Sequence, residues 1–147
     1  MKIAFVTAER ATCKRHHVGA VVVCDRRILT GGYNGAPAGL LDCLELGCLR
    51  DENNVPSGER TEICRAVHAE ENAIIQGAVY ATSLRGATIY CTHSPCRRCA
   101  KMLCNVGIKR YVTCFNYDDS TFRDLFEAVK IEFEVLSRVP LDIEVLK

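Results

Sequence analysis

The sequence predicts an α/β protein with a mixed sheet of about five strands and helices on the faces of that sheet. Short runs of β-branched and aromatic residues alternate with segments of helical composition along the chain. In residues 87–115 a strand, a helix and a second strand follow one another, as in a parallel βαβ unit. The chain of 147 residues has the usual length of one domain, so we expect a single domain over residues 1–147.

The N-terminal part is expected to form a β-hairpin followed by a long irregular segment. Residues 18–24 (VGAVVVC) and 27–33 (RILTGGY) favour strands, and Asp25 with the arginines after it supplies the turn. Residues 34–64 show no sustained period and contain two prolines. Such a long irregular stretch is unusual in a compact domain, so we expect something to hold it in place.

Helical composition returns in residues 68–79 (HAEENAIIQGAV), where apolar residues lie near helical spacing. Glu70 and Glu71 favour the positive N-terminal end of this helix. The next expected elements are a strand, a helix closed by Gly107 and a second strand, over residues 87–92, 96–106 and 110–115.

The C-terminal part is expected to add one helix and one strand. Asp119 or Ser120 would cap a helix that runs to about Lys130. Residues 131–135 (IEFEV) alternate like an edge or half-buried strand, which completes the expected sheet.

Composition and charge argue against several classes of protein. The chain is 48% hydrophobic and 25% charged with a net charge of +1, which is typical of a globular protein without a nucleic-acid partner. The apolar run at the start is too short for a secretory signal or a membrane span, so we expect a cytoplasmic protein. In that reducing compartment, the ten cysteines are better explained as metal ligands and small buried residues than as disulfides.

Cys96 and Cys99 are separated by two residues and follow Pro95. Such a pair can be a redox switch, half of a structural zinc site or part of a catalytic metal site. A redox pair would be expected after the first strand of its βαβ pattern, whereas this pair follows a later strand. His68 opens the preceding helix, so one imidazole and two thiolates can meet at one point. Three protein ligands leave the fourth position of zinc to water, as in a catalytic site.

Glu70 lies two residues after His68 and is better placed to carry protons than to bind the metal. This geometry requires both residues to lie in the irregular first turn of the helix. The combination of H-x-E with P-C-x-x-C is a known signature of zinc deaminases. With the stretches TCKRHHVGAVVV, GGYNGAPAG and VHAEENAII, residues 12–117 resemble the cytidine deaminase-like superfamily, and within it the deoxycytidylate deaminases.

The resemblance implies a three-layer fold and the hydrolytic deamination of dCMP to dUMP with release of ammonia, which supplies dUMP for thymidylate synthesis. It implies that His68, Cys96 and Cys99 hold a catalytic Zn²⁺. The hydroxide activated by this metal would attack C4 of cytosine, while Glu70 carries protons to N3 and then to the leaving amino group.

The glycine-rich stretch GGYNGAPAG is either a plain turn after a strand or, as the resemblance implies, a segment that contacts nucleotides. In the second interpretation Asn34 bonds the sugar, and Tyr33 and Gly35 lie beside it. Ala69 belongs to the same expected substrate site. Tyr117 resembles the aromatic residue near the base, with a plain surface turn as the alternative. Relatives are activated by dCTP and inhibited by dTTP, and Mg²⁺ would accompany such an effector.

Of the eight cysteines outside the H-x-E and P-C-x-x-C signature, four are candidates for a second, structural Zn²⁺ that holds the irregular segment. The resemblance to relatives with a second zinc is closest for Cys13 and Cys43. Free or partly disulfide-bonded cysteines are the alternative, and His16, His17 or His93 could replace one ligand. The four candidates are Cys13, Cys43, Cys48 and Cys64.

Other functions share the same signature. A deaminase acting on dCTP, guanine or tRNA adenosine has these motifs, although GYNGAPAG and the cysteine-rich insertion favour a deoxycytidine nucleotide. A non-catalytic, zinc-stabilised binding protein could use the same fold, but a purely structural site has no use for Glu70. The resemblance also implies a homo-oligomer, commonly a hexamer.

Overall fold

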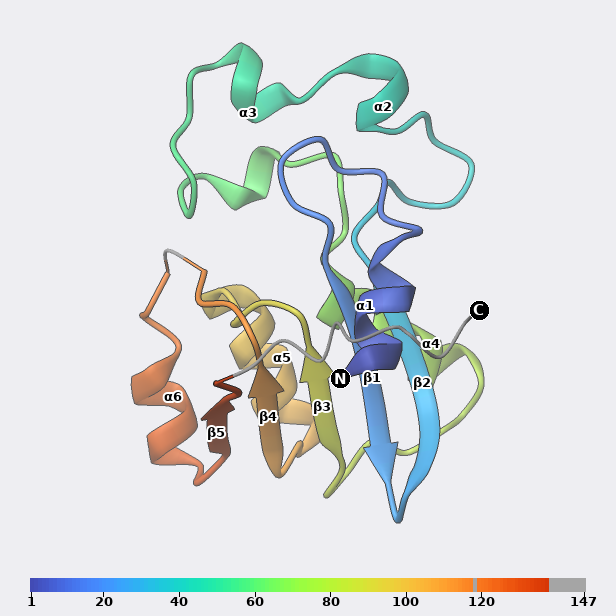
Figure 1. The fold of residues 1–147 in the computed structure, drawn as a ribbon, viewed down its shortest axis with the longest axis vertical. Helices are drawn as coiled ribbons and strands as arrows, with labels where there is room; N and C mark the ends of the chain where they lie inside the picture. The colour runs from blue at the N-terminus through green and yellow to red at the C-terminus, as the bar shows by residue number, and fades with distance from the viewer. Residues whose placement is uncertain (118, 138–147) are drawn as a thin grey trace.

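A computed structural model describes residues 1–117 and 119–137, in which five strands form one mixed sheet (Figure 1). The strand order is β2-β1-β3-β4-β5. Strand β1 is antiparallel to β2 and β3, whereas β3, β4 and β5 are parallel. This sheet confirms the predicted fold class. The strands are β1 (Gly19–Cys24), β2 (Arg27–Tyr33), β3 (Thr88–Cys91), β4 (Arg110–Thr113) and β5 (Glu132–Val135).

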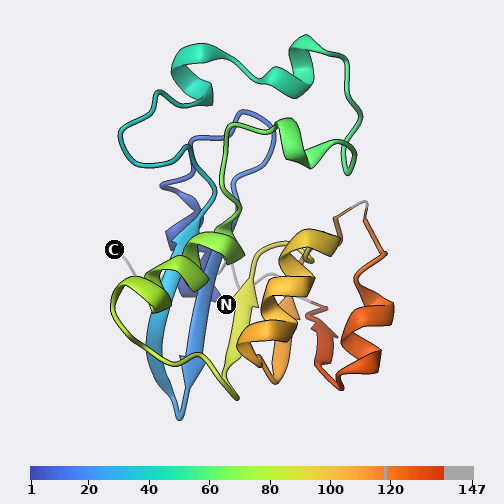
Figure 2. The same ribbon diagram turned by 180° about the vertical axis from the view of Figure 1, so that it is seen from behind.

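Helices cover both faces of the sheet and make three layers (Figures 1 and 2). One face is covered at β1 and β2 by α1, and the opposite face is covered by α4 and α5, which lie side by side. Helix α6 packs beside α5 and β5. The helices are α1 (Lys2–Ala8), α2 (Cys43–Leu46), α3 (Leu49–Glu52), α4 (Ala69–Val79), α5 (Arg97–Val106) and α6 (Arg123–Ala128), with a 3₁₀ turn η1 (Thr61–Ile63).

Two glycines in the hairpin let helices on opposite faces approach the sheet closely. A Cβ atom at Gly19 would lie 2.1 Å from the carbonyl oxygen of Ala4 in α1. A Cβ atom at Gly32 would lie 2.3 Å from the carbonyl oxygen of Ala69 in α4. The first turn of α4, which contains the His-Ala-Glu motif, therefore rests directly on the backbone of β2.

The core lies between the sheet and the layer that contains α4 and α5. Val22, Ile89 and Leu103 are fully buried there, and Tyr111 packs against Phe126 with ring centroids 5.8 Å apart. Burial of large side chains from β1, β3, β4 and α5 fixes the βαβ unit. The N-terminal ends of α4 and α5 are therefore held in a defined position.

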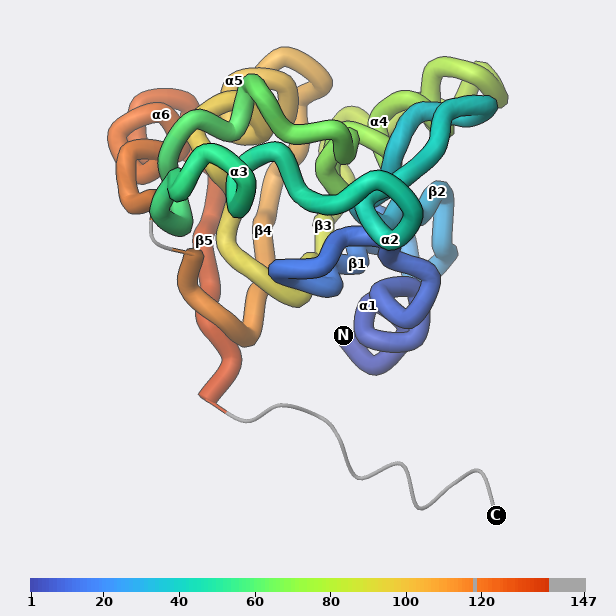
Figure 3. The backbone as a smooth tube through the Cα atoms, turned by 90° about the horizontal axis from the view of Figure 1, so that it is seen from above, coloured from blue at the N-terminus to red at the C-terminus, as the bar shows by residue number. Residues whose placement is uncertain are grey.

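Residues 36–66, called the cap segment below, leave the sheet after β2 and return to it before α4. Gly35 and Val67 form an antiparallel bridge at the base of this segment. The segment contains only α2, α3 and η1 as regular structure, in agreement with the absence of a sustained period in the sequence. It lies over one end of the sheet, above the first turns of α4 and α5 (Figures 1 and 3).

The expected capping of α6 is wrong. Helix α6 starts at Arg123 after Phe122, and no side chain caps it. The Asp119 carboxylate instead accepts hydrogen bonds from the backbone N–H groups of Arg97, at 2.9 Å, and Thr121, at 2.8 Å. Asp119 therefore caps the start of α5, because the fold brings that helix end next to it.

Across the described residues, none of the helices has the length and apolar character that a membrane span requires.

Candidate active site

The first turns of α4 and α5 bring the three candidate metal ligands together. His68 and Cys96 are the N-cap residues of these helices, and both have an extended backbone. His68 Nδ1 lies 3.5 Å from Cys96 Sγ and 3.4 Å from Cys99 Sγ. The ligand atoms of the three residues all lie within 4.8 Å of one another. The structure thus gathers residues that are 28 and 31 positions apart in the sequence.

The spacing of these atoms fits zinc. Zn–N and Zn–S bonds of about 2.0 and 2.3 Å at a tetrahedral angle place N and S about 3.5 Å apart. The two observed N–S separations, 3.5 and 3.4 Å, agree with this value. One imidazole and two thiols are also a donor set that zinc commonly takes. His68, Cys96 and Cys99 can therefore hold the ion with little rearrangement.

The three ligands also affect one another's protonation. A hydrogen bond with Cys99, together with His68, lowers the pKa of Cys96 to about 4. Burial would lower the pKa of His68, but its hydrogen bond with Cys96 and the nearby Glu70 raise it. The lowered pKa favours the thiolate form of Cys96, and a thiolate is the form that binds metal.

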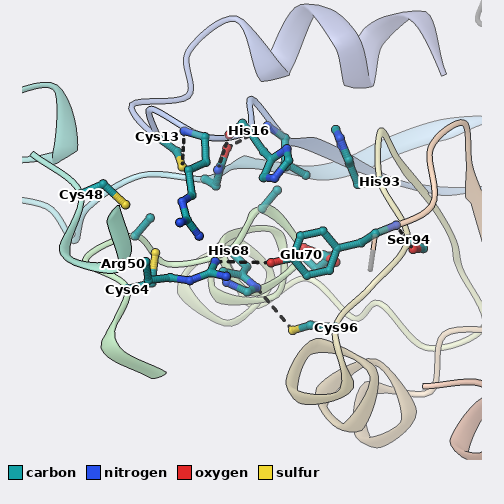
Figure 4. A pocket seen from close by; sticks show the side chains of 16 residues that line it. Cys13, His16, Cys48, Arg50, Cys64, His68, Glu70, His93, Ser94 and Cys96 are labelled. Atoms are coloured by element: carbon teal, nitrogen blue, oxygen red, sulfur yellow. Dashed lines mark hydrogen bonds between the residues drawn. The ribbon is translucent and has the colours of Figure 1, made fainter. Parts of the chain in front are cut away.

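Glu70 lies beside the metal ligands and is only 4% exposed (Figure 4). Burial raises the pKa of Glu70 to about 7, although the charge of His68 opposes this shift. The Tyr111 hydroxyl lies 3.2 Å from Glu70 Oε1 and 2.7 Å from the carbonyl oxygen of His93. When Tyr111 donates its single proton to His93, its oxygen can accept one from protonated Glu70. Tyr111 can therefore serve both protonation states of Glu70.

A pocket opens above these groups, between the sheet edge and the cap segment (Figure 4). Its wall contains most of the residues that the sequence predicts for the site, and it also contains His93 and Ser94. The predicted site residues that line the pocket are Cys13, Asn34, Cys48, Cys64, His68, Ala69, Glu70, Cys96 and Tyr117.

Tyr33 and Gly35 do not line this pocket. They line a second depression together with Asn72 and Gln76 of α4 and with Tyr80, which follows α4. Side chains alternate along a strand, so residues next to Asn34 face away from the pocket that Asn34 lines. The structure therefore separates the GYNG stretch into two surfaces.

Asn34 is buried, and its carboxamide organises the pocket wall. Its Oδ1 accepts a hydrogen bond from the Val18 N–H, and its Nδ2 donates to the His16 carbonyl oxygen, both at 2.8 Å. The amide group has two N–H donors, so one of them is still able to bond a ligand. Asn34 thus has a structural role in the pocket wall and one remaining N–H donor.

Two arginines outside the predicted site residues line the same pocket. Arg50 is 5% exposed and donates to the Pro56 carbonyl oxygen and the Tyr117 hydroxyl, at 2.6 and 3.4 Å. Arg15 donates to Asp51 and to the Val55 carbonyl oxygen, at 2.6 Å each. Arg50 Nε and Arg15 Nη1 are buried without a hydrogen-bond partner among the described residues. Their positive charge and unpaired donors are suited to an anionic ligand.

Three of the four remaining candidate cysteines, Cys13, Cys48 and Cys64, line the pocket, and Cys43 lies near them, but the four do not form a tight cluster. Cys13, Cys43 and Cys48 are buried, and none of the ten cysteines forms a disulfide bond. Burial, followed by the proximity of the other three sulfurs, raises the pKa of Cys43 to about 11. In the part of the chain that the structure describes, only His68, Cys96 and Cys99 bring three ligand atoms within 4.8 Å.

Known proteins are similar in sequence to most of this chain. The family model described as the cytidine and deoxycytidylate deaminase zinc-binding region matches residues 1–115. A deoxycytidylate deaminase of Mycobacterium phage D29 is 42% identical over 115 residues, which cover 75% of this chain and 87% of the phage protein. The deoxycytidylate deaminase of Schizosaccharomyces pombe is 35% identical over 123 residues and 82% of this chain, but this match covers only 38% of the yeast enzyme.

A solved structure is similar over nearly the whole fold. The dCMP deaminase of cyanophage S-TIM5, in complex with dCMP and dUMP, superposes with a TM-score of 0.77 at 32% identity, over 92% of each chain. The five-stranded sheet with its flanking helices is thus the fold of a known dCMP deaminase. Together with the family match over residues 1–115, this likeness shows that the chain belongs to the cytidine and deoxycytidylate deaminase family.

Proposed function

We propose that this protein is a zinc-dependent deoxycytidylate deaminase, which converts dCMP and water to dUMP and ammonia. The observation that carries the proposal is the convergence of His68, Cys96 and Cys99 with the buried carboxylate of Glu70 at one pocket. The relatives named as deoxycytidylate deaminases and the cyanophage complex with dCMP and dUMP support the choice of substrate.

The metal ligands and Glu70 have separate tasks in this mechanism. A zinc ion held by His68, Cys96 and Cys99 would supply a water molecule of lowered pKa as the nucleophile. Glu70 accepts a proton from the attacking water and delivers a proton to N3 of the cytosine ring. It then takes the second proton of the attacking water and transfers it to the departing amino group, so that the C4–N bond breaks and ammonia leaves. A pKa of about 7 suits this carboxyl group to both accepting and donating protons near neutral pH.

The cationic wall of the pocket favours a nucleotide over a nucleoside. Arg15 and Arg50 each have one buried N–H donor without a partner among the described residues. A phosphate oxygen would satisfy such donors through charge-assisted hydrogen bonds. We therefore assign these two side chains to the phosphate of the substrate.

A second zinc ion would explain why the cap segment is ordered. Cys13 lies before β1, and the other three candidate ligands lie in the cap segment. Coordination by Cys13, Cys43, Cys48 and Cys64 would tie these two parts of the chain together. The raised pKa of Cys43 fits a thiol that ionises only when it binds metal.

We also propose a binding site for regulatory nucleotides and a surface for subunit assembly. The depression lined by Tyr33 and Gly35 is the proposed position for the effectors dCTP and dTTP, with Mg²⁺ bound to the triphosphate. The exposed apolar side chains of Ile75, Val79 and Tyr80 support a homo-oligomer, of which a hexamer is the expected form.

The proposed activity is tested by measuring ammonia release from dCMP, dCTP, deoxycytidine and guanine in parallel with zinc-loaded protein. Glu70→Gln serves as the blank, because it keeps the size of the side chain and loses its acid–base function. We expect turnover of dCMP alone. Equal turnover of deoxycytidine would contradict the phosphate assignment, and a Glu70→Gln variant with full function would favour a binding protein.

A further inference from the structure

A second carboxylate on α4, that of Glu71, connects the two helices that carry the candidate zinc ligands. Glu71 Oε2 accepts a hydrogen bond of 2.9 Å from the backbone N–H of His68. The carboxylate also accepts two hydrogen bonds from Arg98 on α5, at 2.5 and 2.6 Å. The Glu71 side chain is only 7% exposed, so it is fixed between these partners.

Arg98 lies within the Cys-x-x-Cys sequence, between Cys96 and Cys99. Its guanidinium group binds Glu71 with two parallel hydrogen bonds, which restrict direction as well as distance. Across the described residues, this is the one ion pair that joins α4 to α5. Neither residue lines the pocket, so neither is placed to touch the substrate.

The geometry of the metal site depends on how α4 and α5 are placed relative to each other. The imidazole comes from the N-cap of one helix, and the two sulfurs come from the first turn of the other. A shift between the helices would change both N–S distances at once. The Glu71–Arg98 pair crosses this boundary within three residues of every ligand.

We propose that Glu71 and Arg98 form a clamp that positions His68 against Cys96 and Cys99 and thereby sets the affinity of the site for zinc. The role is one of positioning, since it acts through the ligands. It rests on the proposed function in one respect, namely that zinc binds at these three residues.

Arg97 offers a matched control in the same helical turn. It also binds a carboxylate through more than one hydrogen bond, but its partner is Asp124 on α6. The side chains of Arg97 and Arg98 have similar exposure, 42% and 50%. The two arginines therefore differ mainly in the helix to which they connect α5.

The experiment compares zinc affinity in Arg98→Met, Arg97→Met and the unchanged protein by competition with a chromogenic chelator. His68→Ala, which removes a ligand, identifies the fraction of zinc bound at this site. We expect Arg98→Met to bind this zinc about 10- to 100-fold more weakly, as for other residues that orient metal ligands. Arg97→Met should stay within about twofold of the unchanged protein. Arg98→Lys keeps the charge without the paired geometry and should lie between them.

Two further measurements separate positioning from a general loss of stability. In cobalt-substituted protein, Arg98→Met should shift the visible absorption bands, which report ligand geometry, whereas Arg97→Met should leave them unchanged. Glu71→Gln retains an acceptor for the His68 N–H, and its combination with Arg98→Met should weaken binding no more than the larger single effect. Equal loss in Arg97→Met and Arg98→Met would overturn the proposal. An unchanged zinc content in His68→Ala would instead overturn the proposed metal site itself.

Discussion

Among the described residues, Tyr111 supplies the side-chain hydrogen bond to the buried Glu70 carboxyl group. The Tyr111 oxygen lies 3.2 Å from Glu70 Oε1, and Tyr111 is fully buried. A buried carboxyl group without a hydrogen-bond partner is costly and adopts other positions. Tyr111 is therefore expected to act as a positioning residue for proton transfer.

We predict that Tyr111→Phe lowers kcat about tenfold, which corresponds to ~1.4 kcal/mol or one lost hydrogen bond. KM for dCMP should change little, because Tyr111 does not line the pocket.

Glu70→Gln should lower kcat by at least ~100-fold with zinc retained. Steady-state kinetics and metal analysis of both variants check this, and a Tyr111→Phe variant with unchanged kcat would contradict it.

His93 should make the stability of the protein depend on pH. Burial, followed by the charge of His16, lowers the pKa of His93 from 6.5 to about 4. Between pH 4 and pH 6.5, His93 therefore binds a proton in the unfolded chain but not in the folded chain. The stabilising effect is complete above pH 6.5 and is lost progressively as the pH falls toward 4.

The corresponding measurement is the Tm at pH 7.5 and pH 5 for the unchanged protein and for His93→Gln. After a discount for partial exposure, the effect at pH 5 is ~1 kcal/mol, or about 2–4 °C. Between pH 7.5 and pH 5, the Tm of the unchanged protein should fall about 2–4 °C further than the Tm of His93→Gln. Equal losses would show that His93 does not titrate in this way.

The sequence identifies the metal ligands more readily than the residues around them. His68, Cys96 and Cys99 belong to short motifs whose spacing follows from the first turns of two helices, and the structure places their ligand atoms together. Tyr111 and Arg50 have no such local signal, because their partners lie 41 and 67 residues away in the sequence. Contacts of this kind depend on the register of β4 and on the path of the cap segment.

At the scale of secondary-structure elements, the hairpin and the βαβ unit are predictable because each has a strong local pattern. Helices α2 and α3 have only four residues each, too few for a helical period to be visible. Helix α1 has seven residues and two buried alanines, Ala4 and Ala8, so packing against β1 rather than amphipathic pattern explains it. Short elements of this kind are stabilised by tertiary contacts, which a single sequence does not show.

The contact between β2 and α4 can be tested with two neighbouring glycines. We predict that Gly32→Ala destabilises the fold by about 1–3 kcal/mol, because the new Cβ atom would lie 2.3 Å from the Ala69 carbonyl oxygen and 2.5 Å from the Ala73 nitrogen. Since Ala69 follows His68, zinc affinity should also fall.

Gly31→Ala in the same strand is the matched control. Its nearest neighbour would be the Ala20 carbonyl oxygen at 3.5 Å, which is an ordinary contact. Urea denaturation and zinc competition should therefore show a clear loss for Gly32→Ala and almost none for Gly31→Ala. Similar behaviour of the two variants would mean that α4 moves away without cost.

At the scale of the whole molecule, the second zinc ion is expected to hold the cap segment over the pocket. We predict two zinc ions per chain and a decrease to one in Cys43→Ser, with a lower Tm, because the cap segment loses its link to Cys13. Metal analysis and thermal denaturation of freshly purified protein check this. A single zinc in the unchanged protein, or a Cys43→Ser variant with an unchanged Tm, would count against the second site.

The bridge between Gly35 and Val67 has an evolutionary consequence. The chain enters and leaves the cap segment through this one pair, so insertions or exchanges there need not disturb the strand register. Loop closure becomes only slowly less favourable with length, which makes such changes tolerable. Arg50 lines the pocket from the cap segment, whereas Glu70 and the candidate zinc ligands lie outside the cap segment. Recombination at the bridge could therefore alter substrate selectivity while the deamination chemistry is inherited intact.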